Sequence, residues 1–154
     1  MDTVITPVSL DYAQILEMLP HRYPFLLVDR ITECVPGEYS KGYKNLTWND
    51  SFFQGHFPGN PVMPGVLQIE ACAQCSAPII LCLPEYKGKL ALFAGIENAK
   101  FKNMVRPGDR LDMEVRLVRL KGPYAISEAK TFVDGKLCME ATIKALMVDP
   151  EEKR

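Results

Sequence analysis

The strongest constraint on the fold is a run of apolar residues that begins just after Pro64. Proline near the start of a helix uses its fixed φ and loses no intrahelical donor, so the sequence predicts a helix from this point. From Val66 to Leu81 the run leaves almost no polar face, which is typical of a helix buried on all sides. Glu70 lies in the second turn of this helix. An unpaired charge there would be strongly destabilising, so the carboxyl group must have a partner, be neutral or face a cavity.

The final third of the chain predicts a long antiparallel meander. Apolar and charged residues alternate from 111 to 120, as in a strand with one face in water. Gly122-Pro123 and Asp134-Gly135 are turn sequences that separate this strand from two more at 124–133 and 137–148. We also expect a short amphipathic helix at 10–19 and strands at 23–31, 39–48, 90–96 and 99–105. The pattern predicts an α+β domain in which a sheet curls around one hydrophobic helix.

Composition and charge limit the possible classes of protein. With 154 residues and 47% hydrophobic content, the chain is expected to form one domain over 1–154. The formal net charge of -1 gives no general bias toward nucleic acid or membrane surfaces. Polar residues interrupt the longest apolar run, so a membrane span is not expected. The charged tail at 149–154 is expected to fray.

The cysteines indicate a reducing compartment. There are five, an odd number, and Met1–Val4 lack the basic start and apolar core of a signal peptide. We therefore expect a cytoplasmic protein, or an organellar one if a targeting segment has been removed. Cys72 and Cys75 have the spacing of a redox or zinc pair, but they fall inside the predicted helix and no second pair follows. No metal site is expected from them.

The segment before the helix supplies a second candidate for chemistry, His56. Glycines and prolines from Gly55 to Gly65 restrict the backbone around this ring, which is how loops that position reactive groups tend to be built. An imidazole can remove a proton and a neutral carboxylic acid such as Glu70 can donate one. The Gly65 N–H, free at the start of the helix, could polarise a carbonyl oxygen. The three groups suit proton removal beside a carbonyl with loss of a group at the next carbon. The structural alternatives are an ordinary loop histidine and a buried carboxyl bonded to backbone.

Several segments carry a resemblance to a known family. The segments LPHRYPFLLVDR (19–30), GHFP (55–58), PVMPGVLQIEA (61–71), FAG (93–95) and RPGDRL (106–111) closely resemble FabZ-type 3-hydroxyacyl-[acyl-carrier-protein] dehydratases, over about 16–148. The resemblance implies a hot-dog fold, an antiparallel sheet wrapped around a central helix. It also implies dehydration of a (3R)-3-hydroxyacyl thioester to the trans-2-enoyl product in fatty-acid elongation, with His56 as base, Glu70 as acid and the Gly65 N–H on the carbonyl oxygen. No metal or organic cofactor is implied.

The resemblance also implies partners. The substrate would be an acyl chain linked through phosphopantetheine to acyl carrier protein, and the histidine and glutamate of one site would come from two protomers of a dimer. Dimers would assemble into a trimer of dimers. Related dehydratase-isomerases carry aspartate at the position of Glu70, so glutamate favours plain dehydration. Leu92 falls where some members have a tyrosine that gates the acyl tunnel, so no gate is assigned here.

Two further features have a bland and a functional interpretation. Between Asn98 and Lys121 there are seven basic residues and three acidic ones. These bases are either part of a solvated strand face or a dock for the acidic carrier protein. The four bases nearest the resembling segments are Lys100, Lys102, Arg106 and Arg110. His21 also lies in a resembling segment, and we expect it to cap or bridge backbone near the first strand.

Two other functions remain open from the sequence. A hot-dog thioesterase would release a free thiol instead of an enoyl thioester. A non-catalytic thioester-binding subunit would hold the acyl chain without turning it over, although the presence of both His56 and Glu70 argues against it.

Overall fold

The computed structural model describes residues 5–151, which form one twisted antiparallel sheet with a helix in its concave side. Hydrogen bonding places the described strands in the order β1-β2-β3-β5-β6-β7-β4. The strands are β1 (Val8–Leu10), β2 (Arg30–Val35), β3 (Tyr39–Asn45), β4 (Leu90–Phe101), β5 (Arg110–Lys121), β6 (Tyr124–Val133) and β7 (Lys136–Val148). The helices are α1 (Tyr12–Met18), α2 (Phe52–Gly55), α3 (Gly65–Leu81) and the 3-10 turn η1 (Pro84–Tyr86).

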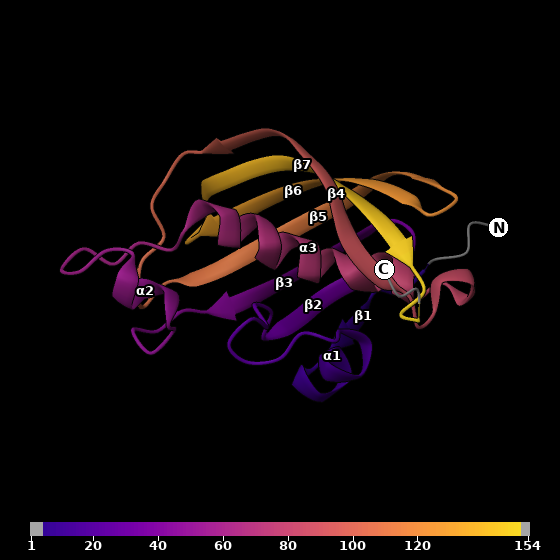
Figure 1. The fold of residues 1–154 in the computed structure, drawn as a ribbon, viewed down its shortest axis with the longest axis horizontal. Coiled ribbons are helices and arrows are strands. Elements are labelled where there is room, and N and C mark those ends of the chain that lie inside the picture. Colours follow the sequence, from indigo (N-terminus) through magenta and orange to yellow (C-terminus); the bar gives the residue numbers. More distant parts are fainter. Residues whose placement is uncertain (1–4, 152–154) are drawn as a thin grey trace.

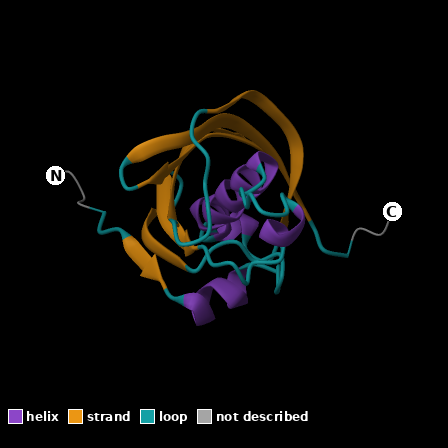
Figure 2. Cartoon of the chain, turned by 90° about the vertical axis from the view of Figure 1, so that its left-hand side faces the viewer, coloured by secondary structure: helices purple, strands orange, loops and turns teal. Residues whose placement is uncertain are grey.

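Helix α3 is the centre of the molecule. It crosses the concave side of the sheet (Figure 1), and seen from the end the strands curve around it (Figure 2). Its contacts are mainly with β5, β3, β6 and β7. Ile69, Cys72 and Ile79 of α3 are at most 3% exposed and belong to the same core as Val115 and Ala129 of the sheet. The predicted α+β architecture, with the sheet wrapped around this helix, is confirmed.

One face of α3 departs from the expected burial on all sides. Glu70, Ala73 and Ser76 follow one another at a spacing of three residues and are only half-buried. Residues three apart lie on the same side of a helix. These three line a cavity between α3 and the sheet. The helix is therefore packed on its other sides and open along this one.

The strand predicted at 23–31 is wrong for most of its length, because β2 begins only at Arg30. Leu27 and Val28 are each 1% exposed, so their apolar character reflects burial in the core and not a place in the sheet. The backbone of this segment forms hydrogen bonds with a side chain of α3 instead. Phe25 O accepts from Gln74 Nε2 at 2.8 Å, and Leu27 N donates to Gln74 Oε1 at 2.7 Å.

Smaller differences lie at element boundaries. The short N-terminal helix is confirmed as α1, with Asp11 as the N-cap of a capping box. Strand β1 and helix α2 were not predicted, since each spans only three or four residues. The separate strands expected at 90–96 and 99–105 form one strand, β4, whose irregular register against β7 interrupts the sequence pattern. The meander of β5, β6 and β7 is confirmed.

Strand β4 is an edge strand with apolar side chains in solvent. It pairs with β7 alone in the sheet of residues 5–151. The exposed large side chains are those of Leu92, Phe93, Ile96 and Phe101, each more than 40% exposed. Natural proteins rarely leave a long apolar edge uncovered.

The expectations for the chain ends fall largely outside the described residues. Residues 1–4, on which the absence of a signal sequence was argued, and residues 152–154 of the charged tail are not described. Asp149, at the start of that tail, forms an ion pair with Lys89 at 3.0 Å. Among residues 5–151, no helix has both the length and the hydropathy needed to cross a bilayer.

Candidate active site

His56 lies at the C-cap of α2, in a loop that is held by its own backbone. Phe57 and Asn60 exchange two backbone hydrogen bonds of 3.0 and 2.9 Å, and Val62 N donates to His56 O at 2.8 Å. Arg106 reaches this loop from outside and donates to Asn60 Oδ1 at 2.9 Å. The loop therefore presents the His56 ring from a fixed backbone.

The tautomer of His56 follows from a hydrogen bond of its side chain. Nδ1 lies 2.7 Å from Val62 O. A carbonyl oxygen can only accept, so Nδ1 carries the hydrogen and, in the neutral ring, Nε2 keeps its lone pair. The ring also stacks on Phe57, with centroids 4.0 Å apart. This arrangement is suited to a base that acts through Nε2.

Of the three alternatives expected for a carboxyl group in this helix, Glu70 shows two, a partner and a cavity. Oε1 accepts a hydrogen bond from Gln74 Nε2 at 2.9 Å, and the side chain is 16% exposed. His21 Nε2 lies 3.4 Å from the same oxygen. The structural alternative for Glu70, a carboxyl bonded to backbone, does not describe this contact, because both neighbours are side chains.

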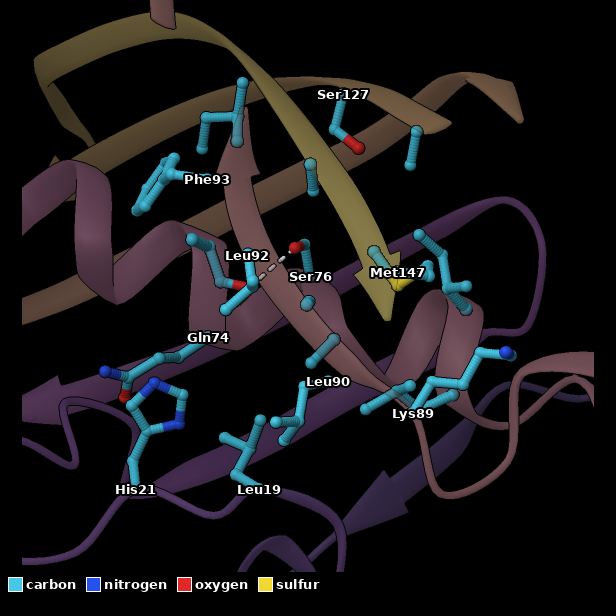
Figure 3. A pocket seen from close by; sticks show the side chains of 18 of the residues that line it. Leu19, His21, Gln74, Ser76, Lys89, Leu90, Leu92, Phe93, Ser127 and Met147 are labelled. Carbon is cyan, nitrogen blue, oxygen red and sulfur yellow. Dashed lines mark hydrogen bonds between the residues drawn. The ribbon is translucent and has the colours of Figure 1, made fainter. Parts of the chain in front are cut away.

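His21 differs from its expected role. Instead of bridging backbone, its ring faces Glu70 through Nε2, while Nδ1 is buried without a partner among the described residues. The sequence analysis also missed Gln74 as a partner of Glu70. Gln74 lies four residues after Glu70 and therefore on the same side of the helix. Figure 3 shows His21 and Gln74 next to each other at one end of the cavity.

The cavity has a volume of about 160 Å³ and is mainly apolar. Its walls come from α3, from β4 and from the inward-facing residues of β6 and β7, with Lys89 near the opposite end from His21 (Figure 3). Leu92 lines it as well, so this side chain is placed at the wall even though no gating role follows. Glu70 is the carboxyl group in the lining. A slender apolar chain with a polar head at Glu70 fits this shape.

Gly65 is the first residue of α3, where the N–H has no intrahelical acceptor. A Cβ at this position would lie 2.6 Å from Cε1 of Phe101, closer than real Cβ contacts come. The absence of a side chain therefore lets the Phe101 ring pack against the start of α3, and a Cβ would force that ring to shift. The same absence leaves the helix N-terminus open to a bound carbonyl.

The structure does not bring all three predicted groups into one cavity. Glu70 lines the apolar cavity between α3 and the sheet, whereas His56 and Gly65 do not. Gly65 lines a separate hollow with Val62, the residue to which His56 is bonded. Within one chain, the base side and the acid side of the predicted site are thus distinct.

The cysteines behave as small apolar residues. Cys72 and Cys75 are fully buried free thiols. Burial raises the pKa of Cys72 well above its usual range and that of Cys75 to about 12, so both remain protonated at neutral pH. Among residues 5–151 no three His, Cys, Asp or Glu side chains gather as metal ligands would.

The four bases of the proposed carrier dock are exposed, and two of them, Lys102 and Arg110, lie beside acidic side chains. Lys102 lies 3.6 Å from Glu140, and Lys100 faces Glu140 across the β4–β7 ladder. Arg110 pairs with Asp112 at 2.9 Å. Arg106 holds the loop of His56, as described above.

Comparison with known proteins decides the family. The model of the FabA-like domain matches residues 19–142. Among curated relatives, the 3-hydroxyacyl-[acyl-carrier-protein] dehydratase FabZ of Clostridium novyi (strain NT) is 53% identical over 135 residues, which cover 88% of this chain and 95% of the relative. The chain belongs to the FabZ-type dehydratases. The FabZ of Bacillus subtilis (strain 168) is 52% identical over 87% of this chain and 95% of its own length. The chain is accordingly a hydro-lyase.

Two solved structures that match this fold are more distant in sequence. The dehydratase heterocomplex ApeI:P from Xenorhabdus doucetiae matches with a TM-score of 0.76 at 15% identity, covering 90% of this chain and 93% of that one. A hypothetical thioesterase with coenzyme A from Streptococcus pneumoniae TIGR4 matches with a TM-score of 0.60 at 12% identity, covering 77% of this chain and 84% of that one. At such identities these likenesses show the fold alone, the hot-dog fold.

Proposed function

We propose that this chain dehydrates (3R)-3-hydroxyacyl-[acyl-carrier-protein] to trans-2-enoyl-[acyl-carrier-protein] in fatty-acid elongation. The observation that carries the proposal is the identity of about half of all residues with curated FabZ dehydratases over nearly their whole length. The mainly apolar cavity that ends at a carboxyl group supports it, because an acyl chain needs such a lining and its 3-hydroxyl group needs an acid.

His56 and Glu70 divide the chemistry. His56 Nε2 takes the proton from C2 of the substrate, and the electron pair of that C–H bond forms the C2–C3 double bond. The C3–O bond breaks as Glu70 transfers its proton to the leaving oxygen, which departs as water. The Gly65 N–H stabilises the charge that grows on the thioester oxygen. Return of a proton from the imidazolium, through solvent, restores the carboxylic acid. No cofactor takes part in any step.

We propose further that the active unit is a homodimer, formed at the β4 edge, and that dimers associate into a trimer of dimers. Two observations support a second copy there. The apolar edge of β4 is uncovered, and the same strand forms one wall of the cavity that holds Glu70. A second copy on this edge would also bring its His56 to the cavity of Glu70, which the His56 of the same chain does not line. The cytoplasm is the proposed compartment, in keeping with five free cysteines.

The carrier protein is proposed to dock on the bases between β4 and β5. Lys102 and Arg110 are the better candidates, since their side chains are 48% and 59% exposed despite their acidic neighbours. Arg106 is a weaker candidate, because its guanidinium group donates to Asn60 in the loop of His56. Turnover of carrier-linked substrate should fall with added salt while turnover of a pantetheine-linked substrate stays constant. Equal salt dependence for the two substrates would contradict this dock.

The assigned roles are tested by His56→Ala and Glu70→Gln. Each should lower dehydration of a hydroxyacyl thioester by roughly 100-fold or more, the contribution typical of a positioned acid or base. The formation of the enoyl thioester is followed by its ultraviolet absorbance, and circular dichroism checks that both variants fold. Retained turnover in either variant would remove that residue from the mechanism.

The same assay separates the other two functions. A thiol-trapping reagent beside the ultraviolet measurement detects thioesterase activity as free thiol without enoyl product. Binding of a carrier-linked acyl chain with neither product would identify a non-catalytic subunit.

A further inference from the structure

Gln74 has a buried side chain that takes part in none of the steps of the proposed reaction. It is 2% exposed and lies one turn after Glu70 on α3. Both N–H groups of its amide donate hydrogen bonds, and its oxygen accepts one. Its oxygen accepts from Leu27 N at 2.7 Å, and its nitrogen donates to Phe25 O at 2.8 Å and to Glu70 Oε1 at 2.9 Å.

These contacts fix which way the amide points. Leu27 N–H can only donate, so it needs the amide oxygen, and Phe25 C=O can only accept, so it needs the amide nitrogen. A flip of the amide would break both bonds at once. The second N–H of Gln74 therefore has to face Glu70, whatever the state of that carboxyl group.

The donor reaches one of the two carboxyl oxygens only. Oε1 takes the hydrogen bond from Gln74 and also has His21 Nε2 at 3.4 Å. In the described residues, no hydrogen bond or ion pair engages Oε2. A protonated carboxyl group has one carbonyl oxygen, which accepts well, and one hydroxyl, which donates.

We propose that Gln74 is a positioning residue that occupies Oε1 of Glu70 and thereby makes Oε2 the oxygen that delivers the proton to the leaving hydroxyl group. This inference rests on the proposed function, because it concerns the acid of that reaction. Gln74 does not touch the substrate. It holds the acid in one rotamer and continues to donate to the carboxylate that remains after the proton has left.

The chain offers a matched control. Thr131 on β6 is fully buried and donates to Gln68 Oε1 at 2.7 Å, so Thr131→Val also removes a buried hydrogen bond to a glutamine of α3. It does so without touching Glu70. Both Gln74→Met and Thr131→Val should lower the melting temperature.

The test compares two leaving groups on pantetheine-linked substrates, hydroxide and fluoride. Loss of fluoride from a 3-fluoroacyl thioester gives the same enoyl product and still needs the base. It needs little help from an acid, because fluoride is a far weaker base than hydroxide. A defect in the acid should therefore appear with the 3-hydroxy substrate and be rescued with the 3-fluoro substrate.

For Gln74→Met we expect kcat to fall roughly 10-fold or more with the 3-hydroxy substrate, KM to change little, and the loss with the 3-fluoro substrate to be about 3-fold at most. Thr131→Val should show small and equal effects on both substrates. Gln74→Glu provides a second variant, since it keeps an acceptor for Leu27 N–H while replacing the donor that faces Glu70. It should show the same selective loss, and it carries the test if the methionine variant does not fold.

Equal losses on the two substrates in the folded Gln74 variants would overturn the proposal, because they would show a general structural role. Full activity on the 3-hydroxy substrate would overturn it as well. The outcome for Glu70→Gln tells this failure from that of the proposed function. If Glu70→Gln shows the selective loss and Gln74 variants do not, only the positioning role fails; if Glu70→Gln shows no loss, the acid itself has been assigned wrongly.

Discussion

At the scale of the residue, each of the two reactive side chains is held at one atom and free at another. His56 Nδ1 donates to Val62 O, and Glu70 Oε1 accepts from Gln74 Nε2. The free atoms, Nε2 and Oε2, are those that the proposed reaction uses. Such one-sided anchoring limits rotation of the ring and of the carboxyl group while leaving a lone pair or a proton available.

The buried thiol of Cys75 should make the fold less stable at alkaline pH. Burial raises its pKa from 9.0 to about 12 in the folded chain. Below pH 9 the thiol is protonated in both states, so it has no effect there. Between pH 9 and pH 12 the thiol ionises in the unfolded chain but not in the folded one, so stability falls as pH rises. At pH 10.5 the loss from this thiol should be about 2 kcal/mol.

Chemical denaturation at pH 8 and at pH 10.5 measures this loss. Cys75→Ala will have its own, lower stability at pH 8, because it leaves a small cavity and removes a contact of Ser40 Oγ. Its further decrease up to pH 10.5 should be about 2 kcal/mol smaller than that of the unaltered protein. Equal decreases in the two proteins would show that the thiol does not remain protonated in the fold.

The candidate residues were open to prediction to different degrees. His56, Glu70 and Gly65 lie within one short stretch whose prolines, glycines and apolar run stand out in the sequence. Gln74 was passed over, because its meaning depends on Phe25 O and Leu27 N, almost fifty positions earlier in the chain. Backbone groups of a distant loop leave no signal in the letters of the sequence.

At the scale of the element, the start of α3 is fixed by a ring from β4. The ideal Cβ at Gly65 would come within 2.6 Å of Phe101 Cε1. Gly65→Ala should lower the free energy of unfolding by about 1–3 kcal/mol, the usual range for overpacking. Phe101 is 52% exposed, so truncation of its ring should cost little by itself.

The double variant Gly65→Ala/Phe101→Ala tests the cause. If the ring is the obstacle, the double variant should be more stable than Gly65→Ala, and it should keep dehydratase activity, since alanine keeps the backbone N–H. A double-mutant cycle by urea denaturation measures the coupling. Additive effects of the two substitutions would mean that Gly65 is required for another reason.

Elements with a clear period were predictable and those without one were not. Strands β5, β6 and β7 alternate regularly and end at glycine turns, so the meander followed from the pattern. The segment 23–29 is as apolar as a strand, but its backbone hydrogen bonds go partly to a helix side chain. Short buried runs of this kind cannot be assigned by composition, because burial in a loop and burial in a strand select the same residues.

At the scale of the whole molecule, the separation of His56 from the cavity of Glu70 leads to a test by complementation. If the site joins His56 of one copy to Glu70 of another, a mixed dimer of His56→Ala and Glu70→Gln chains contains one site with both residues intact. Random mixing makes half of the dimers mixed, and each then has one working site of two. Coexpressed chains should show about a quarter of the unaltered activity.

The measurement is the rate of enoyl thioester formation, first by the coexpressed mixture and then by mixed dimers purified through two different affinity tags, which should reach about half of the unaltered activity. Each variant expressed alone is the control and should be inactive. Sites built within single chains would leave the mixture inactive too, because every site would then lack one of its two groups. Sedimentation analysis of the same sample gives the size of the assembly.

The shared use of Gln74 has a consequence for how this sequence can change. Two backbone groups of the 25–27 segment and one oxygen of Glu70 draw on a single amide. A substitution that shifts either backbone group also shifts the carboxyl group, so the segment cannot drift without an effect on chemistry. We therefore expect deep mutational scanning to find 25–27 far less tolerant than its irregular backbone and the exposed ring of Phe25 would suggest.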